Sequence, residues 1–212
     1  AGSFSSVSAV SLVFVGGINL WRSNNQGTTW TYIGGYQFPR VHPDMHYMKF
    51  KPGTSTLYVG HDGGISTTSN SGSSWNHISD GFNITQYYKM STSQQRPDLV
   101  IGGSQDNSTH IMRGSVWEVP FGGDGMDCQM HNAKPNIFFT SIYYGTIYRT
   151  TNSGANFSTI SNNIPGGPTG DWVTPFALCT ADNDIIVAGY QKVYASQDNG
   201  TSWTAISPNI VS

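Results

Sequence analysis

The segment from His42 to His46 has the residue types and spacing that could hold a metal ion. His42, Asp44 and His46 alternate along the chain, so on a β-strand their side chains would share one face and could ligate a divalent metal. No fourth ligand is fixed by the sequence, and an Asp beside a His is equally a structural hydrogen-bonded pair. We therefore predict no cofactor, with a divalent metal at this segment as the alternative.

Further carboxylates and one more histidine join Asp44 and His46 as candidate ligand-binding residues. They are His61, Asp62, Asp106, Asp124 and Asp127. Asp62 precedes two glycines and Asp106 precedes an asparagine, so both can equally be carboxylates that only stabilise a turn. The glycine-rich run around Asp124 lacks the Lys-Ser/Thr pair and the helix of a phosphate-binding loop, so it does not indicate a phosphate site.

Aromatic side chains complete the candidate set. These are Tyr143, Tyr144, Trp172 and Tyr190. Ligand sites commonly combine aromatic walls with a few polar groups, and Tyr143, Tyr144 and Trp172 could stack on sugar rings. The same three rings could equally cover the edges of the fold without binding a ligand. Both interpretations remain open from the sequence.

An octet near the end of the chain indicates which kind of element would position these residues. It reads S-x-D-x-G-x-x-W, with Ser196, Asp198, Gly200 and Trp203 at the fixed positions. The carboxylate can accept backbone N–H groups, Gly can take a positive φ and the Ser hydroxyl can add a local bond. These properties suit a tight hairpin turn, after which the Trp would begin the next strand with its ring buried.

The octet recurs along the chain, with Asn in place of Asp and once with Phe in place of Trp. The matching residues are Ser23, Gly27 and Trp30; Asn70, Gly72 and Trp75; and Asn152, Gly154 and Phe157. A weaker fifth match keeps only the glycine and the aromatic position, Trp117. The five aromatic positions are 45, 42, 40 and 46 residues apart, and a period of about 40–50 residues is typical of a β-propeller blade.

With these repeats the chain resembles the Asp-box (BNR) repeat proteins, which include sialidases, xyloglucanase-type glycosidases, sortilin-type receptors and secreted bacterial propellers. The resemblance implies an all-β fold, a β-propeller of four-stranded antiparallel blades without helices. The five repeats would form either a closed five-bladed ring or part of a larger propeller. We expect a single domain over residues 1–212, with repeats at about 1–38, 39–80, 81–121, 122–163 and 164–212.

Blade topology predicts where the candidate residues meet. In a propeller, the loop that enters the innermost strand and the loop between the second and third strands open on the same face. The candidate carboxylates, histidines and aromatics fall on these two sets of loops, so we expect them to surround one funnel near the propeller axis. The octet residues, including Asp198, would serve only the scaffold.

Composition excludes several classes of partner. The net charge is −2 and 10% of the 212 residues are charged, which provides no basic surface for nucleic acid. No apolar run approaches the roughly 20 residues of a membrane-spanning helix, so we expect no membrane insertion. Cys128 and Cys179 would lie on inner strands of neighbouring repeats, as two buried thiols or as a disulfide.

The resemblance leaves two main hypotheses for function. Sialidase chemistry needs an arginine cluster and a Tyr–Glu nucleophile pair, whereas this chain has five arginines and a single glutamate, Glu118, beside an octet aromatic. A xyloglucanase-type hydrolase needs an acid and a base about 6.5–9.5 Å apart if it is inverting, for which Asp44 with Asp124 or Asp127 are the candidates. That family's cleft lies between two large propellers, and this chain has residues for one.

We therefore favour a non-catalytic module that binds a glycan or protein ligand and belongs to a secreted or cell-surface bacterial protein. It would be a monomer or part of a larger multidomain chain. A glycoside hydrolase domain is the alternative, and a purely structural spacer is the remaining interpretation.

Overall fold

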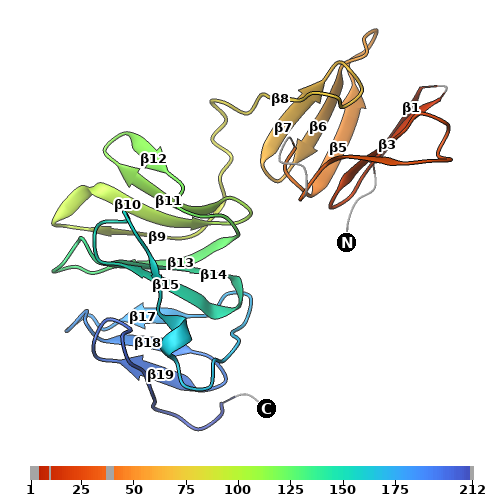
Figure 1. Cartoon of the computed structure of the whole chain (residues 1–212). Helices are drawn as coiled ribbons and strands as arrows, with labels where there is room; N and C mark the ends of the chain where they lie inside the picture. Colours follow the sequence, from red (N-terminus) through yellow and green to blue (C-terminus); the bar gives the residue numbers. More distant parts are fainter. Residues whose placement is uncertain (1–4, 10, 37–40, 211–212) are drawn as a thin grey trace. The chain divides into compact units, whose positions relative to one another are not determined.

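The structure is a computed structural model that describes residues 5–9, 11–36 and 41–210, and it confirms the all-β blade architecture (Figure 1). The strands form five antiparallel sheets of four strands each, and within every sheet neighbouring strands follow one another in the chain. Each sheet is therefore a four-stranded meander, as a propeller blade requires.

The chain divides into two compact units, Ala1–Ile84 and Thr85–Ser212. Unit 1 contains two blades and unit 2 contains three. The strands of unit 1 are β1 (Ser5–Ala9), β2 (Leu12–Gly16), β3 (Leu20–Ser23) and β4 (Thr31–Gly34) in blade 1, and β5 (Met45–Phe50), β6 (Leu57–His61), β7 (Gly64–Thr68) and β8 (Asn76–His77) in blade 2.

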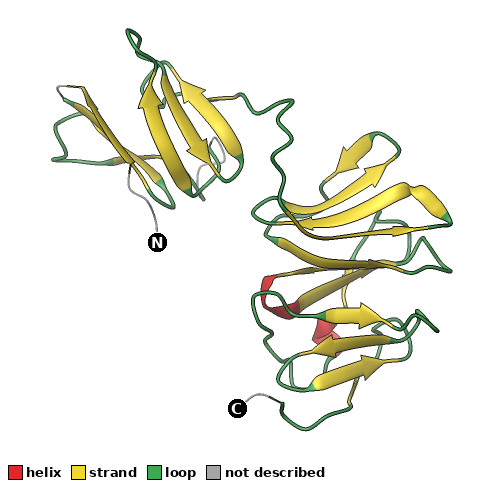
Figure 2. Ribbon diagram, turned by 180° about the vertical axis from the view of Figure 1, so that it is seen from behind, coloured by secondary structure: helices red, strands yellow, loops and turns green. Residues whose placement is uncertain are grey.

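Unit 2 repeats the same plan three times. Its strands are β9 (Tyr87–Ser93), β10 (Arg96–Ser104), β11 (Ser108–Arg113) and β12 (Val116–Glu118) in blade 3; β13 (Gly125–Met130), β14 (Phe138–Ile142), β15 (Thr146–Thr150) and β16 (Ser158–Thr159) in blade 4; and β17 (Phe176–Leu178), β18 (Ile186–Gly189), β19 (Val193–Ser196) and β20 (Thr204–Ala205) in blade 5. Figure 2 shows these meanders with short loops between their strands.

Within the described residues, helical structure is limited to two short 3₁₀ turns, η1 (Tyr143–Gly145) and η2 (Ser161–Asn163). Each spans three residues, and neither continues into an α-helix. None of the helical segments in the described part of the chain is long and apolar enough to cross a membrane.

The hydrophobic cores lie between consecutive blades of the same unit. In unit 1, Phe14 and Leu20 of blade 1 share a core cluster with Val59 of blade 2. In unit 2, Ile101 of blade 3 shares a cluster with Phe138 of blade 4. A third cluster joins blades 4 and 5. Because each cluster is built from two sheets, a blade needs its neighbour to bury its apolar face.

Glycines allow two backbones to approach closely at one of these junctions. A Cβ at Gly103 of β10 would collide with the carbonyl of Met126, and a Cβ at Gly125 of β13 would collide with the carbonyl of Ser108. Blades 3 and 4 therefore meet backbone to backbone at this point, an approach that only glycine permits.

The hairpin turns predicted from the octets are confirmed and share one hydrogen-bond pattern. In the last octet, the Ser196 hydroxyl accepts the N–H groups of Asp198 and Gly200 and donates to Asp198 Oδ1. Asp198 Oδ1 also accepts the N–H of Ser202, at 2.8 Å. The same set of bonds starts from the hydroxyls of Ser23, Thr68 and Thr150.

Backbone conformation explains why the octet glycine is fixed. Gly27, Gly72, Gly154 and Gly200 have φ between 84° and 89°, in the left-handed region that favours glycine. The residue before each of them also has a positive φ, of 58° or 59°, although it is not a glycine. Two successive positive-φ residues make the turn tight enough for its side-chain bonds to close.

The expectation that every octet aromatic is buried is wrong for two of the five. Trp203 is buried, and Trp75 and Phe157 pack against core clusters. Trp30 is 42% exposed and Trp117 is 51% exposed. Both exposed rings belong to the first blade of their unit.

The physical reason is that the later octets lie on the preceding blade. Gly72 lies against Ile33 of blade 1, and Gly200 lies against Ile160 at the end of blade 4. The Trp203 indole accordingly donates to the Ile160 carbonyl, at 3.1 Å. The first blade of a unit has no preceding blade within that unit, so its aromatic ring stays at the surface.

Arginine side chains join consecutive blades, a feature that the sequence did not reveal. Arg22 of β3 donates to the Ser71 carbonyl in the octet turn of blade 2, at 2.7 Å. Arg149 of β15 donates to the equivalent Asn199 carbonyl in blade 5, at 2.8 Å. Arg113 of β11 donates to the Ser153 carbonyl in blade 4 in the same way. We call these three contacts the arginine clasps.

The two cysteines are free, so the disulfide alternative is not formed in this structure. Cys128 is buried on the inner strand β13, and its burial raises the pKa of the thiol to about 12. Cys179 follows β17 and is half-buried. Cys128 therefore behaves as a small core residue.

Candidate functional site

The two sets of loops that were expected to share one face do come together within each unit. In unit 1 the N–H of Asp44, before the inner strand of blade 2, donates to the Ile18 carbonyl between β2 and β3. In unit 2 the N–H of Asp106 donates to Asp124 Oδ1, at 2.6 Å. These bonds connect the second-to-third loop of one blade to the loop that enters the next.

The prediction that His42, Asp44 and His46 share one face of a strand is wrong. Strand β5 begins only at Met45, and Asp44 has a φ of 62°, so the segment is not extended across its length. Without the alternation of a strand, the three side chains are not brought to a common face. Among the described residues, no group of three or more His, Cys, Asp or Glu side chains is arranged to hold a metal ion.

The histidines of unit 1 form a stack instead. The ring of His61, at the end of β6, lies between the rings of His42 and His77, with centroid separations of 6.0 Å on both sides and interplanar angles of 19° and 27°. His61 is buried and its Nε2 lies 2.9 Å from the Ser66 hydroxyl. Its Nδ1 is buried without a hydrogen-bond partner.

This environment opposes protonation of His61. Its pKa is lowered to about 4, mainly by burial; the neighbouring His42 and His77 rings act in the same direction, and Asp62 acts against them. His61 is therefore neutral at pH 7. A buried neutral imidazole within a stack acts as a packing residue, and its unpartnered Nδ1 is enclosed by the protein rather than open to solvent.

His46 and Asp62 form a pair at the surface of unit 1. His46 is largely exposed on β5, and its Nε2 contacts Asp62 Oδ1 in the turn between β6 and β7. The structure thus brings together two of the predicted ligand-binding residues. Asp44 lies in the same unit, whereas Asp124 and Asp127 belong to unit 2.

The two predicted carboxylates of unit 2 are already bonded within the protein. Asp124 accepts the N–H of Asp106, as described above. Asp127 on β13 is buried, and its Oδ2 accepts a bond from Lys89 Nζ of β9, at 2.9 Å. Burial raises the pKa of Asp127, and the bond and charge of Lys89 act against that rise. The carboxylate and ammonium form an ion pair between two inner strands.

Three of the predicted aromatics form a cluster that remains accessible to solvent. Tyr143 and Trp172 stack face to face, with centroids 5.5 Å apart and an interplanar angle of 9°. Tyr144 lies edge-on to both rings. Tyr144 is 53% exposed and Trp172 is 39% exposed. We call Tyr143, Tyr144 and Trp172 the aromatic cluster.

Backbone and side-chain bonds hold the aromatic cluster in place. The N–H of Gly170 donates to the Tyr144 carbonyl, at 3.0 Å. The Trp172 indole donates to the hydroxyl of Tyr88, at 3.2 Å. Tyr88 lies on β9 and is itself partly exposed, so it extends the aromatic surface. Sequence reasoning missed Tyr88 because the adjacent pair Tyr87 and Tyr88 carries no motif that distinguishes a ligand-binding ring from an ordinary strand residue.

Tyr190, the remaining aromatic candidate, lies in the core. It is buried, its hydroxyl donates to the Gly145 carbonyl, and burial raises its pKa. It therefore supports the η1 turn that carries Tyr143 and Tyr144 from beneath. Its predicted role in direct ligand contact is not supported by this position.

The fold defines the chain as an all-β protein of five four-stranded antiparallel blades of the β-propeller type. No protein-family model matches the sequence, and no curated protein matches it.

Solved structures with similar coordinates share little sequence with this chain. One is described as YCF48 bound to D1 peptide, with 14% identity over 92% of this chain and a TM-score of 0.40. Another is a Niastella koreensis GH74 enzyme, with 12% identity over 94% of this chain and a TM-score of 0.35. A third is a nidogen/laminin complex, with 11% identity over 93% of this chain and a TM-score of 0.44. The chain spans 64%, 49% and 78% of these proteins.

Proposed function

We propose that this chain is a non-catalytic binding module of a secreted or cell-surface bacterial protein and that it holds a glycan on the aromatic cluster. The observation that carries this proposal is the exposure of Tyr144 and Trp172 on a rigidly supported loop surface of unit 2. Large aromatic rings normally bury most of their area, and their exposure in a group marks a binding surface.

A glycan fits this surface for two reasons. The C–H faces of a sugar ring pack on flat aromatic rings, and sugar hydroxyls need hydrogen-bonding groups nearby. Asp171 directly precedes Trp172 and is exposed. Its carboxylate accepts the backbone N–H of Trp172, at 2.7 Å. Because a carboxylate has acceptor capacity for more than one donor, Asp171 can also accept from a sugar hydroxyl.

The positions of the carboxylates favour binding over hydrolysis. Hydrolysis needs one protonated and one ionised carboxyl group on opposite sides of an open cleft. In unit 2, Asp127 is buried against Lys89, and Asp124 accepts a backbone N–H. Both carboxylates have structural bonds that a ligand would have to displace.

A glycan array probed with the folded chain tests the proposal, followed by titration of each hit. Trp172→Ala should weaken binding at least tenfold, whereas Trp117→Ala is the matched control because Trp117 is exposed on β12 and is not part of the cluster. Equal binding by the parent and by Trp172→Ala would refute the proposed site.

Two further measurements separate this proposal from the alternatives. Release of reducing sugar from a bound glycan, abolished by Asp127→Asn, would establish the hydrolase interpretation instead. An empty glycan array together with Trp172-dependent capture of a defined protein would show that the surface is a protein-binding site.

A further inference from the structure

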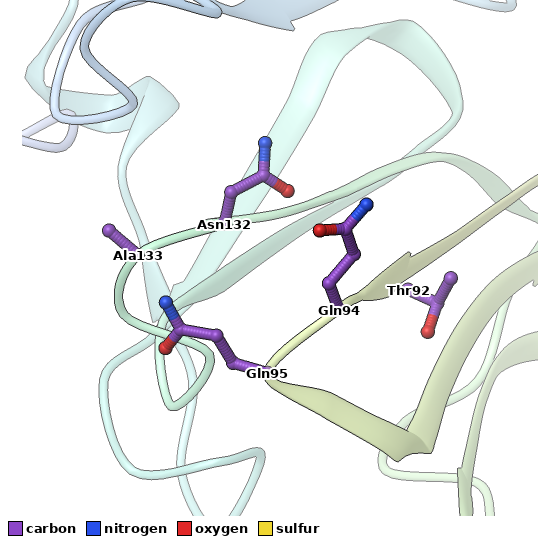
Figure 3. Close-up of a pocket in the computed structure, with 5 residues that line it drawn as sticks. All are labelled: Thr92, Gln94, Gln95, Asn132 and Ala133. Atoms are coloured by element: carbon purple, nitrogen blue, oxygen red, sulfur yellow. The ribbon is translucent and has the colours of Figure 1, made fainter.

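A pocket lined by side-chain amides lies in unit 2, at the blade ends opposite the aromatic cluster. It has a volume of about 530 Å³ and is lined by Thr92, Gln94, Gln95, Asn132 and Ala133 (Figure 3). The first three residues belong to β9 and its turn into β10, and the other two to the turn between β13 and β14. Its size is within the range of about 300–1,000 Å³ common for small-ligand sites.

The wall formed by blade 4 is held by bonds that do not use the pocket amides. The Ser93 hydroxyl donates to the Asn132 carbonyl across the two blades, at 3.3 Å. The Asn132 N–H donates to Asn183 Oδ1, at 2.8 Å. His131 Nδ1 accepts the N–H of Ala133, at 3.2 Å. The backbone that carries Asn132 is therefore held from blades 3 and 5, so this wall of the pocket is in place before a ligand binds.

The side-chain amides of Gln94, Gln95 and Asn132 are available to a ligand. None of the three forms a hydrogen bond with another residue in the described part of the chain, and Figure 3 shows them projecting from the two turns around the pocket. Each amide carries two N–H donors and one carbonyl acceptor. A sugar hydroxyl both donates and accepts, so three amides can match several hydroxyls of one ring.

Charge at this end of unit 2 favours a neutral ligand. Arg96 is paired with Asp98 through two bonds of 2.9 Å. Lys134 is paired with both oxygens of Asp184, at 2.7 Å. No charged residue lines the pocket. An anionic sugar, a phosphate or a carboxylate would find no unpaired cation among the pocket residues.

We propose that this amide-lined pocket binds one neutral sugar residue through its hydroxyl groups, as a second site that is independent of the aromatic cluster. The pocket has no aromatic wall, so recognition would depend on hydrogen bonds, and binding would be weaker than at a stacking surface. The proposal does not depend on the glycan surface proposed above, because the two sites use different loops.

Titration followed by NMR tests the proposal through the side-chain NH₂ resonances of Gln94, Gln95 and Asn132. The probes are the neutral sugars D-glucose, D-galactose, D-mannose and D-xylose, with D-glucuronic acid and the peptide trialanine amide as comparisons. We expect saturable shifts of all three amides with at least one neutral sugar, and a weaker response to both comparison compounds. Asn132→Ala should weaken that binding at least fivefold.

The control variants separate the two sites. Trp172→Ala should leave the amide shifts and their midpoint unchanged, and Asn132→Ala should leave array binding unchanged. Because all three amides are exposed, the variants are expected to fold, and Gln94→Ala provides an independent check if Asn132→Ala does not. The absence of saturable shifts with all four neutral sugars, or tighter binding of glucuronic acid or trialanine amide, would overturn the proposal.

Discussion

The two units are built from blades of the same architecture, but they carry different side chains on the loops that enter the inner strands and join the second and third strands. In unit 1, His61 is stacked between two other histidines and its polar atoms face the protein. In unit 2, Tyr144 and Trp172 lie at the equivalent loops and expose their rings. On these loops unit 1 therefore has a buried histidine ring held in a stack, and unit 2 has a solvent-exposed group of aromatic rings.

This difference shows that scaffold and surface are separable in this repeat. Both units contain octet turns with the same hydrogen bonds, and both contain an arginine clasp. The loops at the other end of the strands are free to vary because they contribute little to these shared contacts. Function is therefore better sought where the units differ than where they agree.

The largest expected effect comes from the octet aromatics. Trp203→Ala should lower the free energy of unfolding of unit 2 by about 3–5 kcal/mol, because it removes a buried indole that also donates to two carbonyls. Trp30→Ala in unit 1 should cost less than about 1 kcal/mol because its ring is substantially exposed. Denaturant unfolding of the two variants measures both values. Equal losses would mean that the two rings are packed alike.

The next largest effect is the pH dependence of unit 1. The pKa of His61 is about 4 in the folded protein and 6.5 in the unfolded chain, so the unfolded state binds more protons between these values. The contribution of His61 to the free energy of unfolding of unit 1 is therefore fully present above about pH 6.5 and is lost as the pH falls toward 4. The shift corresponds to at most about 3 kcal/mol, and less with screening by solvent.

Hydrogen exchange in β6 and β7 between pH 8 and pH 4 measures this loss. His61→Gln should remove most of the pH dependence because glutamine does not titrate, although it also alters the stack with His42 and His77. His46, which contacts Asp62 and is largely exposed, provides the comparison variant His46→Gln. If His46→Gln removed more of the pH dependence than His61→Gln, the effect would be assigned to the surface pair.

A smaller effect is expected from the clasps. Arg149→Ala should destabilise unit 2 by about 1.5–3 kcal/mol, because Arg149 donates to the Asn199 carbonyl and to the Thr201 hydroxyl of the next blade. Arg96→Ala is the matched control, since Arg96 pairs only with the exposed Asp98 and should contribute less than about 1 kcal/mol. Thermal unfolding of both variants decides whether the clasp exceeds an ordinary surface pair.

Much of the fold could be predicted because its signals are local and periodic. The octets predicted one tight hairpin turn per repeat, and their spacing of 40–46 residues predicted four-stranded blades and the number of repeats. The exposure of Trp30 could not be predicted in this way, because it depends on whether a neighbouring blade covers the ring. The octet pattern is the same whether or not that neighbour is present.

The candidate site was less predictable because it depends on contacts between loops. The positive φ of Asp44 ends the expected alternation after His42, and no sequence pattern indicated it. Tyr190 is buried because it packs against the η1 turn, where its hydroxyl donates to the Gly145 carbonyl. Tyr88 joins the aromatic surface because β9 lies beside Trp172, whose indole donates to the Tyr88 hydroxyl. The prediction that the remaining carboxylates bind ligand stays a prediction.

The smallest expected effect is that of Asp198→Asn, although Asp198 belongs to the most regular octet. Asn25, Asn70 and Asn152 occupy the same position and accept the same backbone N–H through Oδ1, at 2.8–2.9 Å. The bond from the Ser202 hydroxyl to Asp198 Oδ2 would be replaced by a bond from the amide N–H₂ to that hydroxyl, as Asn70 makes to Ser74. An asparagine can thus close the turn with the same number of bonds.

We expect Asp198→Asn to change the stability of unit 2 at pH 7 by less than about 0.5 kcal/mol, as for a tolerated surface substitution. Its acid dependence should differ, because the bonds from Ser202 lower the pKa of Asp198 to about 2. A carboxyl with a lowered pKa stabilises the folded state above the unfolded value of 3.8, and that contribution is lost as the pH falls toward 2. The parent should therefore lose stability over this range and the variant should lose less, which thermal unfolding at pH 7, 4 and 2.5 measures. A large loss at pH 7 would show that the charge of Asp198 contributes something that the asparagines of the other octets do not.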